Sequence, residues 1–231
     1  MAPTEPESLA PRRRPGRPRQ SGTAAAGTVR ERLLDAATEL AVEQGFEAIG
    51  LREIAGRAAA SPGMIAYYFG DRQGLYEAMF QRAFDRIGEQ LRALMQDPER
   101  SGGDRLDDLV RLQVETIAAD PWLPQMIVRE VLARAESPSR KRFARRLGGG
   151  PLMLMVRWLE EEQQRGVLRP DFDPRMMAMT LVSLSTFPFL MLSIVGEEIG
   201  LELDAAFPAR LIEHNQKFLA RALRAHSEET R

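Results

Sequence analysis

The sequence predicts an all-α protein of 231 residues, and three observations support this fold class. Apolar residues recur three and four positions apart along most of the chain, a spacing that places them on one face of a helix. The alternation of apolar and polar residues that indicates a half-buried strand is not found. Glycine and proline stand between the periodic segments, where they end one helix and begin the next.

Composition limits the classes of function. The chain has no cysteine, which excludes a disulfide framework, a thiolate metal site and a cysteine nucleophile. Its histidines, His214 and His226, lack the spacing of a metal-binding pair on one helix face. We therefore expect no catalysis, no cofactor and no metal. Because the N-terminus lacks the apolar run of a secretion signal, we expect a cytoplasmic protein.

Residues 1–27 are predicted to form a flexible basic arm, since they are rich in Pro, Gly, Ser and Ala and nearly free of large apolar residues. The stretch RRRPGRPRQ resembles the Gly-Arg-Pro core of an AT-hook, which places arginines in a narrow minor groove. A basic tail that only improves solubility is the alternative. The arginines that would contact DNA are Arg12, Arg13, Arg14, Arg17 and Arg19.

Residues 28–70 are predicted to form three helices, 28–44, 51–58 and 62–69. Gly45 gives the first helix a C-cap. Ser61 offers a hydroxyl N-cap to the third helix, with a proline at the first helical position. Gly70 ends that helix, and Asp71 caps the next one. Two short helices joined by a tight turn describe a helix-turn-helix, whose second helix enters the major groove of DNA.

Within the third helix, Ile65 and Phe69 are spaced to hold it to the core. The other residues then face outward or sideways, and a tyrosine hydroxyl among them can bond a phosphate or a base edge. A small helical domain whose tyrosines pack on the following helix is the alternative. The residues predicted to face DNA are Pro62, Gly63, Met64, Ala66, Tyr67 and Tyr68.

The stretch LREIAGRAAASPGMIAYYFGDRQGLYEAMF, with the helix before it, resembles the DNA-binding domain of the tetracycline-repressor (TetR) family over about residues 29–84. The resemblance implies a homodimeric repressor that binds an inverted repeat in double-stranded DNA and carries a small-molecule effector site in its C-terminal half. By position it also implies DNA contacts for Arg52, for the outward residues of the third helix, and for Arg72, which would bind a phosphate.

The chain departs from the family pattern at three positions. Gly50 stands where the second helix usually has a Thr or Ser cap, and Ala66 replaces the usual Tyr. Ala59 stands where the turn usually has Gly, which costs about 1 kcal/mol if the backbone there is left-handed. Residues 29–80 carry five arginines against eight acidic residues. Affinity for DNA must therefore come from the local placement of arginines and from the arm.

Residues 71–231 are predicted to form a helical domain for effector binding and dimerisation. The expected helices are 71–94, 106–118, 122–135, one from Pro151 to about residue 165, one capped by Asp173, and a last helix over 207–223. Residues 176–196 carry no charge over 21 positions, which is long enough to span a membrane. Their serines, and the acidic residues that follow, favour instead a helix packed between the core and a partner subunit.

The effector is predicted to be small and mainly hydrophobic or aromatic, because large adaptable apolar residues lie between the headpiece and the dimer helices. The GGGP break and Pro188 mark irregular packing, where helical bundles form cavities. Each such residue taken alone is more often part of a core. The candidates are Trp122, Met126, Met153, Met155, Trp158 and Phe187, with Gln113, Arg129 and Glu130 as polar anchors.

Two further interpretations remain open. The run RKRFARR, residues 140–146, is a second nucleic-acid patch or, with more weight, a solvated helix surface. The whole chain is a DNA-binding regulator or, alternatively, a helical adaptor that binds proteins through apolar surfaces and carries its basic arm incidentally. DNA binding that distinguishes one palindrome from random duplex would separate these two functions.

Overall fold

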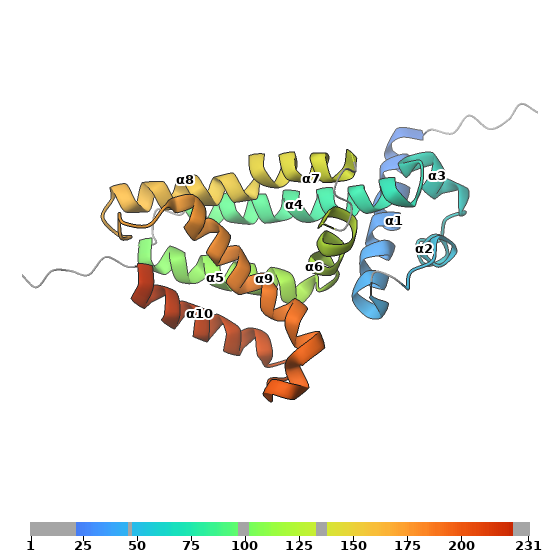
Figure 1. Cartoon of the computed structure of the whole chain (residues 1–231). Coiled ribbons are helices and arrows are strands. Elements are labelled where there is room, and N and C mark those ends of the chain that lie inside the picture. The colour runs from blue at the N-terminus through green and yellow to red at the C-terminus, as the bar shows by residue number, and fades with distance from the viewer. Residues whose placement is uncertain (1–21, 46–47, 97–101, 133–137, 224–231) are drawn as a thin grey trace, which may run out of the picture.

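The computed structural model describes residues 22–45, 48–96, 102–132 and 138–223, and every regular element in these ranges is a helix (Figure 1). This confirms the predicted all-α class. Three helices form a headpiece at one end of the molecule, and the remaining described helices form the body. The headpiece contains α1 (Gly22–Gln44), α2 (Leu51–Arg57) and α3 (Gly63–Phe69). The body contains α4 (Arg72–Gln96), α5 (Gly102–Ala119), α6 (Trp122–Met126), the π-helix η1 (Ile127–Leu132), α7 (Pro138–Gly149), α8 (Pro151–Gln164), α9 (Pro174–Ile199) and α10 (Phe207–Leu223).

The first helix is longer than predicted. It begins at Gly22, whereas the sequence analysis started it at Thr28 and assigned residues 1–27 to a flexible arm. Three consecutive alanines, residues 24–26, explain the difference, because alanine is the best helix former. The sequence analysis assigned these alanines to the arm because they directly follow its Pro- and Gly-rich residues.

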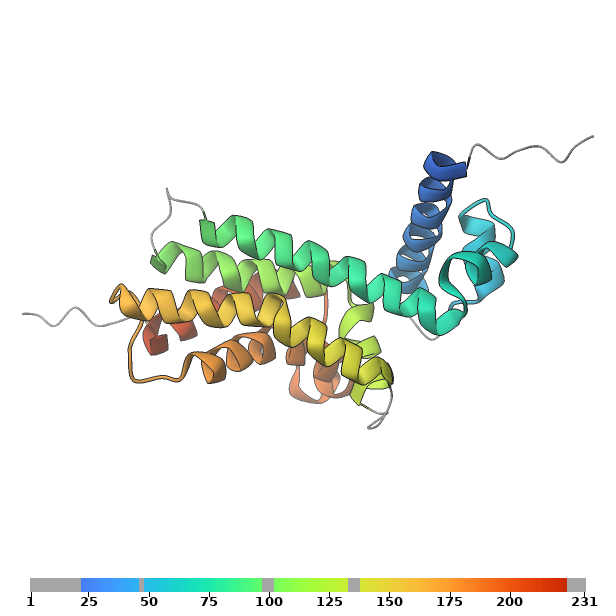
Figure 2. The ribbon, with the colours of Figure 1, turned by 90° about the horizontal axis from the view of Figure 1, so that it is seen from above.

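The headpiece has an apolar core made by one side of each of its helices. Leu33 and Leu40 of α1, Ile54 of α2 and Ile65 of α3 are almost completely buried, together with Leu75 at the start of α4. Helix α4 therefore closes the headpiece core and then continues into the body. In Figure 2, seen from above, α1 lies across the direction of α4, which runs alongside α5 and α8.

The start of α3 differs from the predicted cap. The residue before the helix is Pro62, and no side chain caps its N-terminus, whereas a Ser61 hydroxyl cap was expected. The Ser61 backbone carbonyl accepts the Met64 N–H at 3.0 Å instead. The prediction for α4 is confirmed, since the Asp71 carboxylate accepts the Gly74 N–H at 2.8 Å. A Cβ atom on Gly74 would lie 1.9 Å from the Phe69 carbonyl oxygen, so only glycine fits there.

The body surrounds α4 and α5. Helices α5 and α8 pack on α4, α9 packs on both α5 and α8, and α10 packs on α5 (Figure 1). A second apolar core fills this region, with Leu91, Leu106, Leu159 and Leu181 among its buried members. Helix α7 extends the line of α8 back toward the headpiece.

One predicted helix of the body is divided. Periodicity predicted a continuous helix over 122–135, but α6 ends at Met126 and a π-helix, Ile127–Leu132, follows it. The spacing of apolar residues does not distinguish the wider π turn from the α turn, so this change was not visible in the sequence. Residues 133–135 lie outside the described residues.

Helix α9 contains Pro188, and its packing compensates for the missing N–H. The Asp173 side chain caps the helix as predicted, accepting the N–H of Arg175 at 2.7 Å. A proline removes the hydrogen bond to the carbonyl four residues earlier, here Leu184. The buried side chain of Asn215 on α10 donates to that carbonyl at 3.1 Å. This bond ties α10 to the irregular point of α9.

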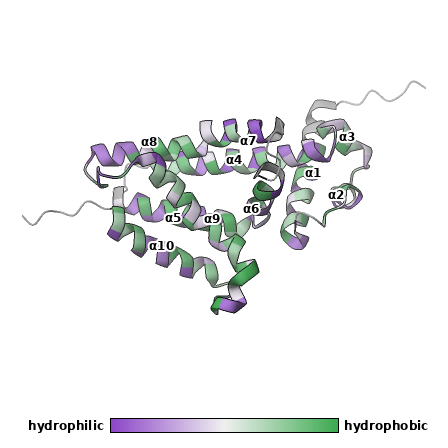
Figure 3. Cartoon of the chain, in the orientation of Figure 1, coloured by the Kyte–Doolittle hydropathy of each residue, from purple (hydrophilic) through white to green (hydrophobic). Residues whose placement is uncertain are grey.

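Only one side of α9 is covered. It is the one described helix that is long and apolar enough to cross a membrane, and 22% of its most apolar window is buried. Figure 3 shows apolar residues along much of α9 and hydrophilic residues along α7. The exposed side chains of α9 include Met176, Met179, Phe187 and Ile194, of which Ile194 is 74% exposed. Within one chain, this side of α9 has no cover.

Candidate nucleic-acid interface and ligand cavity

Helix α3 presents one face to the core and one to the surface. Ile65 is buried, and Phe69 is half-buried against the headpiece core, as predicted. Tyr67 lies on the opposite side and is 76% exposed. Its neighbours on this side of the helix, Pro62, Gly63 and Ala66, are also exposed.

Two of the predicted contact residues, Met64 and Tyr68, have a second role. They are half-buried and pack against the headpiece core. The Tyr68 ring meets the Tyr67 ring edge to face, with centroids 4.9 Å apart, and also lies near Phe69. The three consecutive aromatic residues thus divide between a buried support and one outward ring, Tyr67.

The turn before α3 is fixed by backbone bonds. Ala59 has a φ of 50°, the left-handed conformation that an alanine disfavours. The Ala60 N–H donates to the Ala55 carbonyl at 2.9 Å, and Arg32 of α1 donates to the Ala58 carbonyl at 3.1 Å. Gly50 precedes α2 without any side-chain cap, as expected. These bonds hold α2 and α3 in a fixed relation.

The arginines of the headpiece differ in what they contact. Arg52, at the start of α2, is exposed and forms no hydrogen bond or ion pair with another described residue. Arg57 is instead bound to Glu43 by two hydrogen bonds of 2.9 Å. The bonds from Arg57 lower the pKa of Glu43 below its ordinary value. Arg52 is therefore the α2 arginine that is available to a ligand.

Arg72 is exposed, but part of its guanidinium is already used. It donates to the backbone carbonyl of Ile49 and lies over the Tyr76 ring, 5.6 Å from the centroid. These contacts tie the start of α4 to the segment before α2. Arg12, Arg13, Arg14, Arg17 and Arg19 lie outside the described residues.

A cavity of about 310 Å³ lies inside the body, a size at the lower end of small-molecule sites. Its walls come from α4, α5, α6, η1, α7, α8 and α9, and they are almost wholly apolar. The polar residues on the wall are Gln113, Thr116, Ser185 and Thr186. The apolar ones are Phe84, Ile87, Leu91, Leu112, Ile117, Leu123, Ile127, Phe143, Leu147, Pro151, Leu152, Met155 and Val182.

Gln113 is positioned by two neighbours. Its side-chain oxygen accepts the Ser185 hydroxyl at 3.0 Å, and its amide nitrogen donates to the Met155 sulfur at 3.4 Å. It therefore links α5 to α8 and α9 across the cavity wall. Because a sulfur is a weak acceptor, the amide N–H can turn toward a polar group of a ligand.

Of the predicted effector residues, Gln113 and Met155 are part of the cavity wall, and the other described ones lie elsewhere. Trp122, Met126 and Trp158 are core residues that are at most 3% exposed. Met153 and Phe187 face the surface, as does Arg129 on the π-helix. The side chain of Glu130 lies outside the described residues. The described ones among these side chains do not line the cavity, because periodicity does not tell which side of a buried helix meets a cavity.

Sequence reasoning also missed two buried carboxylates that join helices of the body. Asp120 is buried, accepts the Trp122 indole N–H at 3.0 Å and pairs with Arg86 of α4. Glu162 of α8 is buried, with Arg105 of α5 at 3.1 Å. No local motif marks either carboxylate as buried, since Arg86 and Arg105, which reach them from α4 and α5, are distant in sequence. Among the described residues, no three His, Asp or Glu side chains gather in a way that could hold a metal ion.

Comparison with known proteins supports the same organisation. The family model described as bacterial regulatory proteins, tetR family, matches residues 33–79, and that of a tetracyclin repressor-like C-terminal domain matches residues 103–215. The HTH-type transcriptional regulator BetI of Serratia proteamaculans is 31% identical over 100 residues, 41% of this chain and 50% of BetI. UidR of Escherichia coli K12, another HTH-type regulator, is 24% identical over 68% of this chain and 77% of its own length. The chain thus matches only half the length of BetI.

Solved structures share the fold at low sequence identity. The reduced form of E. coli NemR has a TM-score of 0.68 at 18% identity, covering 86% of this chain and 98% of NemR. A protein of unknown function from Rhodococcus sp. RHA1 has a TM-score of 0.66 at 21% identity, covering 90% of this chain and all of that one. The fatty acid degradation regulator FadR of Bacillus halodurans has a TM-score of 0.63 at 21% identity, over 84% of this chain and 99% of FadR.

Proposed function

The chain belongs to the tetR family of bacterial regulatory proteins and is a DNA-binding transcriptional regulator, and we propose that it acts as a repressor. In this proposal a homodimer binds an inverted repeat and leaves it when a small, mainly hydrophobic molecule fills the cavity of the body. The protein works in the cytoplasm and has no catalytic step. The outward face of α3, with Tyr67 at its centre, is the observation that carries the proposal.

The proposed DNA contacts follow from exposure. Seven residues of helix are about 10 Å long, which fits a major groove about 12 Å wide. Tyr67 and Arg52 would reach base edges, while Gly63 and Ala66 would let the backbone approach the DNA. Met64 and Tyr68 would mainly support this face. Arg72 would bind a phosphate through donors that the Ile49 carbonyl leaves free, since a guanidinium carries five N–H groups.

Selection of bound sequences from a random pool of double-stranded DNA tests this function. We expect enrichment of one inverted repeat, with half-sites about one helical turn apart. Recovery of unselected DNA, or of none, would contradict the proposal and favour the helical adaptor.

The proposed dimer interface is the uncovered side of α9. Met176, Met179, Phe187 and Ile194 follow one another at the spacing of a helix seam, with Leu190 half-buried among them. A second copy would cover this seam, and a two-fold axis would place α9 against α9. Its apolar side would then meet protein, so no membrane is involved.

The oligomeric state tests this interface. The wild type is expected to purify without detergent as a dimer, and Phe187→Glu with Ile194→Glu is expected to give monomer or aggregate. Val42→Glu, at an exposed apolar position on α1, is the matched control and should stay dimeric. Recovery of the wild type only from the membrane fraction would contradict the proposal that the uncovered side of α9 is a dimer interface.

Release from DNA requires the effector to prefer a different arrangement of the two headpieces. Reversing a preference of 99 to 1 takes about 5.5 kcal/mol of differential affinity. A screen of apolar and polar metabolites at matched concentration, by thermal shift and by release of the selected DNA, tests the class of effector. If only highly charged, hydrophilic compounds bind and release DNA, the apolar cavity is not the effector site.

The basic arm is proposed to add sequence-independent affinity. Deleting residues 1–20 removes five arginines. The slope of log K against log salt should then become shallower, by about 0.9 for each DNA phosphate that the arm neutralises in the full-length protein. An unchanged slope would mean that the arm does not contact DNA.

A further inference from the structure

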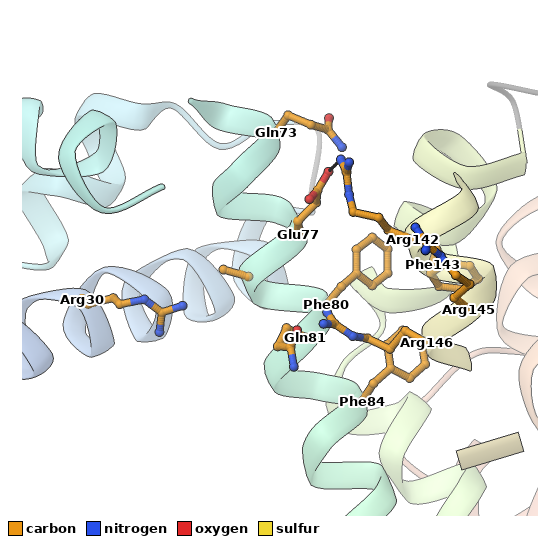
Figure 4. Close-up of a pocket in the computed structure, with 11 residues that line it drawn as sticks. Arg30, Gln73, Glu77, Phe80, Gln81, Phe84, Arg142, Phe143, Arg145 and Arg146 are labelled. Atoms are coloured by element: carbon orange, nitrogen blue, oxygen red, sulfur yellow. Dashed lines mark hydrogen bonds and ion pairs between the residues drawn. The ribbon is translucent and has the colours of Figure 1, made fainter. Parts of the chain in front are cut away.

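A surface groove of about 680 Å³ lies between α4 and α7, next to the apolar cavity (Figure 4). Figure 4 shows Arg142 reaching from α7 to Glu77 of α4 and Arg146 lying between the two helices, while Arg145, which also lines the groove, stays beside α7. Arg30 of α1 completes a set of four arginines. Glu77 is the one acidic residue on the described lining. The groove is therefore strongly basic, although the chain as a whole has a net charge of −1.

Aromatic rings form the inner wall of this groove. Phe80 and Phe84 of α4 stack with their centroids 6.0 Å apart, and the Phe143 ring meets both edge to face, at 5.6 and 5.5 Å. Phe84 and Phe143 also line the apolar cavity. The basic groove and the cavity are thus adjacent sites that share these two rings.

Two of the arginines have charge available for a ligand. Arg142 pairs with Glu77, which balances the acidic residue of the groove. Arg145 donates only its Nε hydrogen, to the Lys141 carbonyl at 3.4 Å. Arg146 forms no hydrogen bond or ion pair with any other described residue. Both side chains are exposed, so the ends of their guanidinium groups can bind an anion from solution.

We propose that the effector is an amphiphile with an anionic head. The hydrocarbon chain of this ligand occupies the cavity, and the ligand leaves the cavity between Phe84 and Phe143. Its carboxylate or phosphate then binds Arg145 and Arg146 in the groove. The inference rests on the proposed role of the cavity as the effector site. It explains why a cavity without a charged residue on its wall adjoins a cluster of arginines.

Physical reasons favour this division of the ligand. An unpaired charge inside the cavity would lose its hydration without compensation, so the charged end must lie outside. A guanidinium binds a carboxylate or phosphate through two parallel hydrogen bonds, which fixes the orientation of the head. The cavity volume equals about ten water molecules, and a methylene group has a similar size, so a chain of about ten carbons fits.

The experiment compares three ligands that share a ten-carbon chain: decanoic acid, decanol and decyl phosphate. Binding to the full-length protein is measured by calorimetry, and release of the selected DNA is measured in parallel. An anionic ligand is expected to bind about ten-fold tighter than decanol. The tighter of decanoate and decyl phosphate identifies the head group. Added salt should lower the affinity for the two anionic ligands and leave the affinity for decanol unchanged.

Variants locate the head group. Arg145→Gln with Arg146→Gln should lower the affinity for the anionic ligand about ten-fold and leave that for decanol unchanged. Arg157→Gln is the matched control, because Arg157 is an exposed arginine of α8 outside the groove and without a partner among the described residues. It should change neither affinity.

Specific results would overturn the inference. If decanol binds and releases DNA as well as the anions do, the anionic head is wrong while the apolar effector site stands. If the arginine variants lose affinity for DNA without any ligand, the α7 arginines bind nucleic acid instead. If none of the three amphiphiles binds, but another apolar compound releases DNA, the ligand class is wrong and the proposed function stands. If no apolar compound of any kind releases DNA, the proposed effector function fails as well.

Discussion

The headpiece and the body bury different kinds of residue. Every residue buried among the described part of the headpiece is apolar, and its ion pairs, such as Arg57 with Glu43, lie at the surface. The buried polar residues of the described chain are Asp120, Glu162, Ser185 and Asn215, and all four belong to the body. Each of them joins two segments that lie on different helices or turns.

This difference indicates two ways of holding a site. The outward face of α3 needs only a rigid apolar support behind it, because its ligand binds from outside. The cavity is walled by helices that must stay apart, and partly buried hydrogen bonds such as the one that Ser185 donates to Gln113 fix their positions. Damage to the polar groups of the body should therefore cost more stability than changes at the surface of the headpiece.

The largest effect is expected for Glu162→Ala. Glu162 is 1% exposed and pairs with Arg105, which is 11% exposed, and with the more exposed Arg165. Removing the carboxylate breaks a buried ion pair, which costs about 3 kcal/mol or more. Urea unfolding of the dimer measures the loss. Glu161→Ala is the control, because the Glu161 pair with Arg165 is exposed and is worth at most about 1 kcal/mol. Equal losses of unfolding free energy in both variants would show that the buried ion pair of Glu162 contributes no more than the exposed pair of Glu161.

A smaller loss is expected for Asn215→Ala, because the Leu184 carbonyl then lacks a donor in a buried region. The cost is about 1 to 3 kcal/mol. The same substitution is also made in a Pro188→Ala variant, in which the backbone N–H at position 188 can donate to the Leu184 carbonyl directly. In that background Asn215→Ala should cost clearly less. Additive effects of the two substitutions in urea unfolding would show that Asn215 does not compensate for the proline.

The smallest effect is a gain in the headpiece. Ala59→Gly removes the strain of a left-handed alanine and should stabilise the protein by at most about 1 kcal/mol. Ala60→Gly is the control, since Ala60 has no positive φ, and it should give no gain. Thermal unfolding measures both variants. A loss of stability in Ala59→Gly would show that the left-handed backbone of Ala59 does not destabilise the wild type.

The two regions also differed in how far the sequence predicted them. Local signals located α2, α3 and the start of α4, because Gly70, Asp71 and the Ile65 to Phe69 spacing act within one or two turns. Resemblance to the family, where this turn usually has Gly, marked Ala59 as the position at which a left-handed backbone would cost stability, and its φ is 50°. The cavity was predicted only as a class of site, and its wall could not be read from Trp122 or Met126. Its lining depends on packing between helices that lie far apart in the sequence.

The most direct test of the central claim, that the outward face of α3 reads DNA, is the affinity of Tyr67→Ala for the selected DNA site. Tyr67 is 76% exposed, so the free energy of unfolding should not change by more than about 0.5 kcal/mol. Specific binding should weaken by about 1 to 3 kcal/mol, and binding to random duplex should remain. Val42→Ala, at another exposed apolar position, should bind like the wild type. If Tyr67→Ala binds the selected site as tightly as the wild type, α3 does not read DNA through this face.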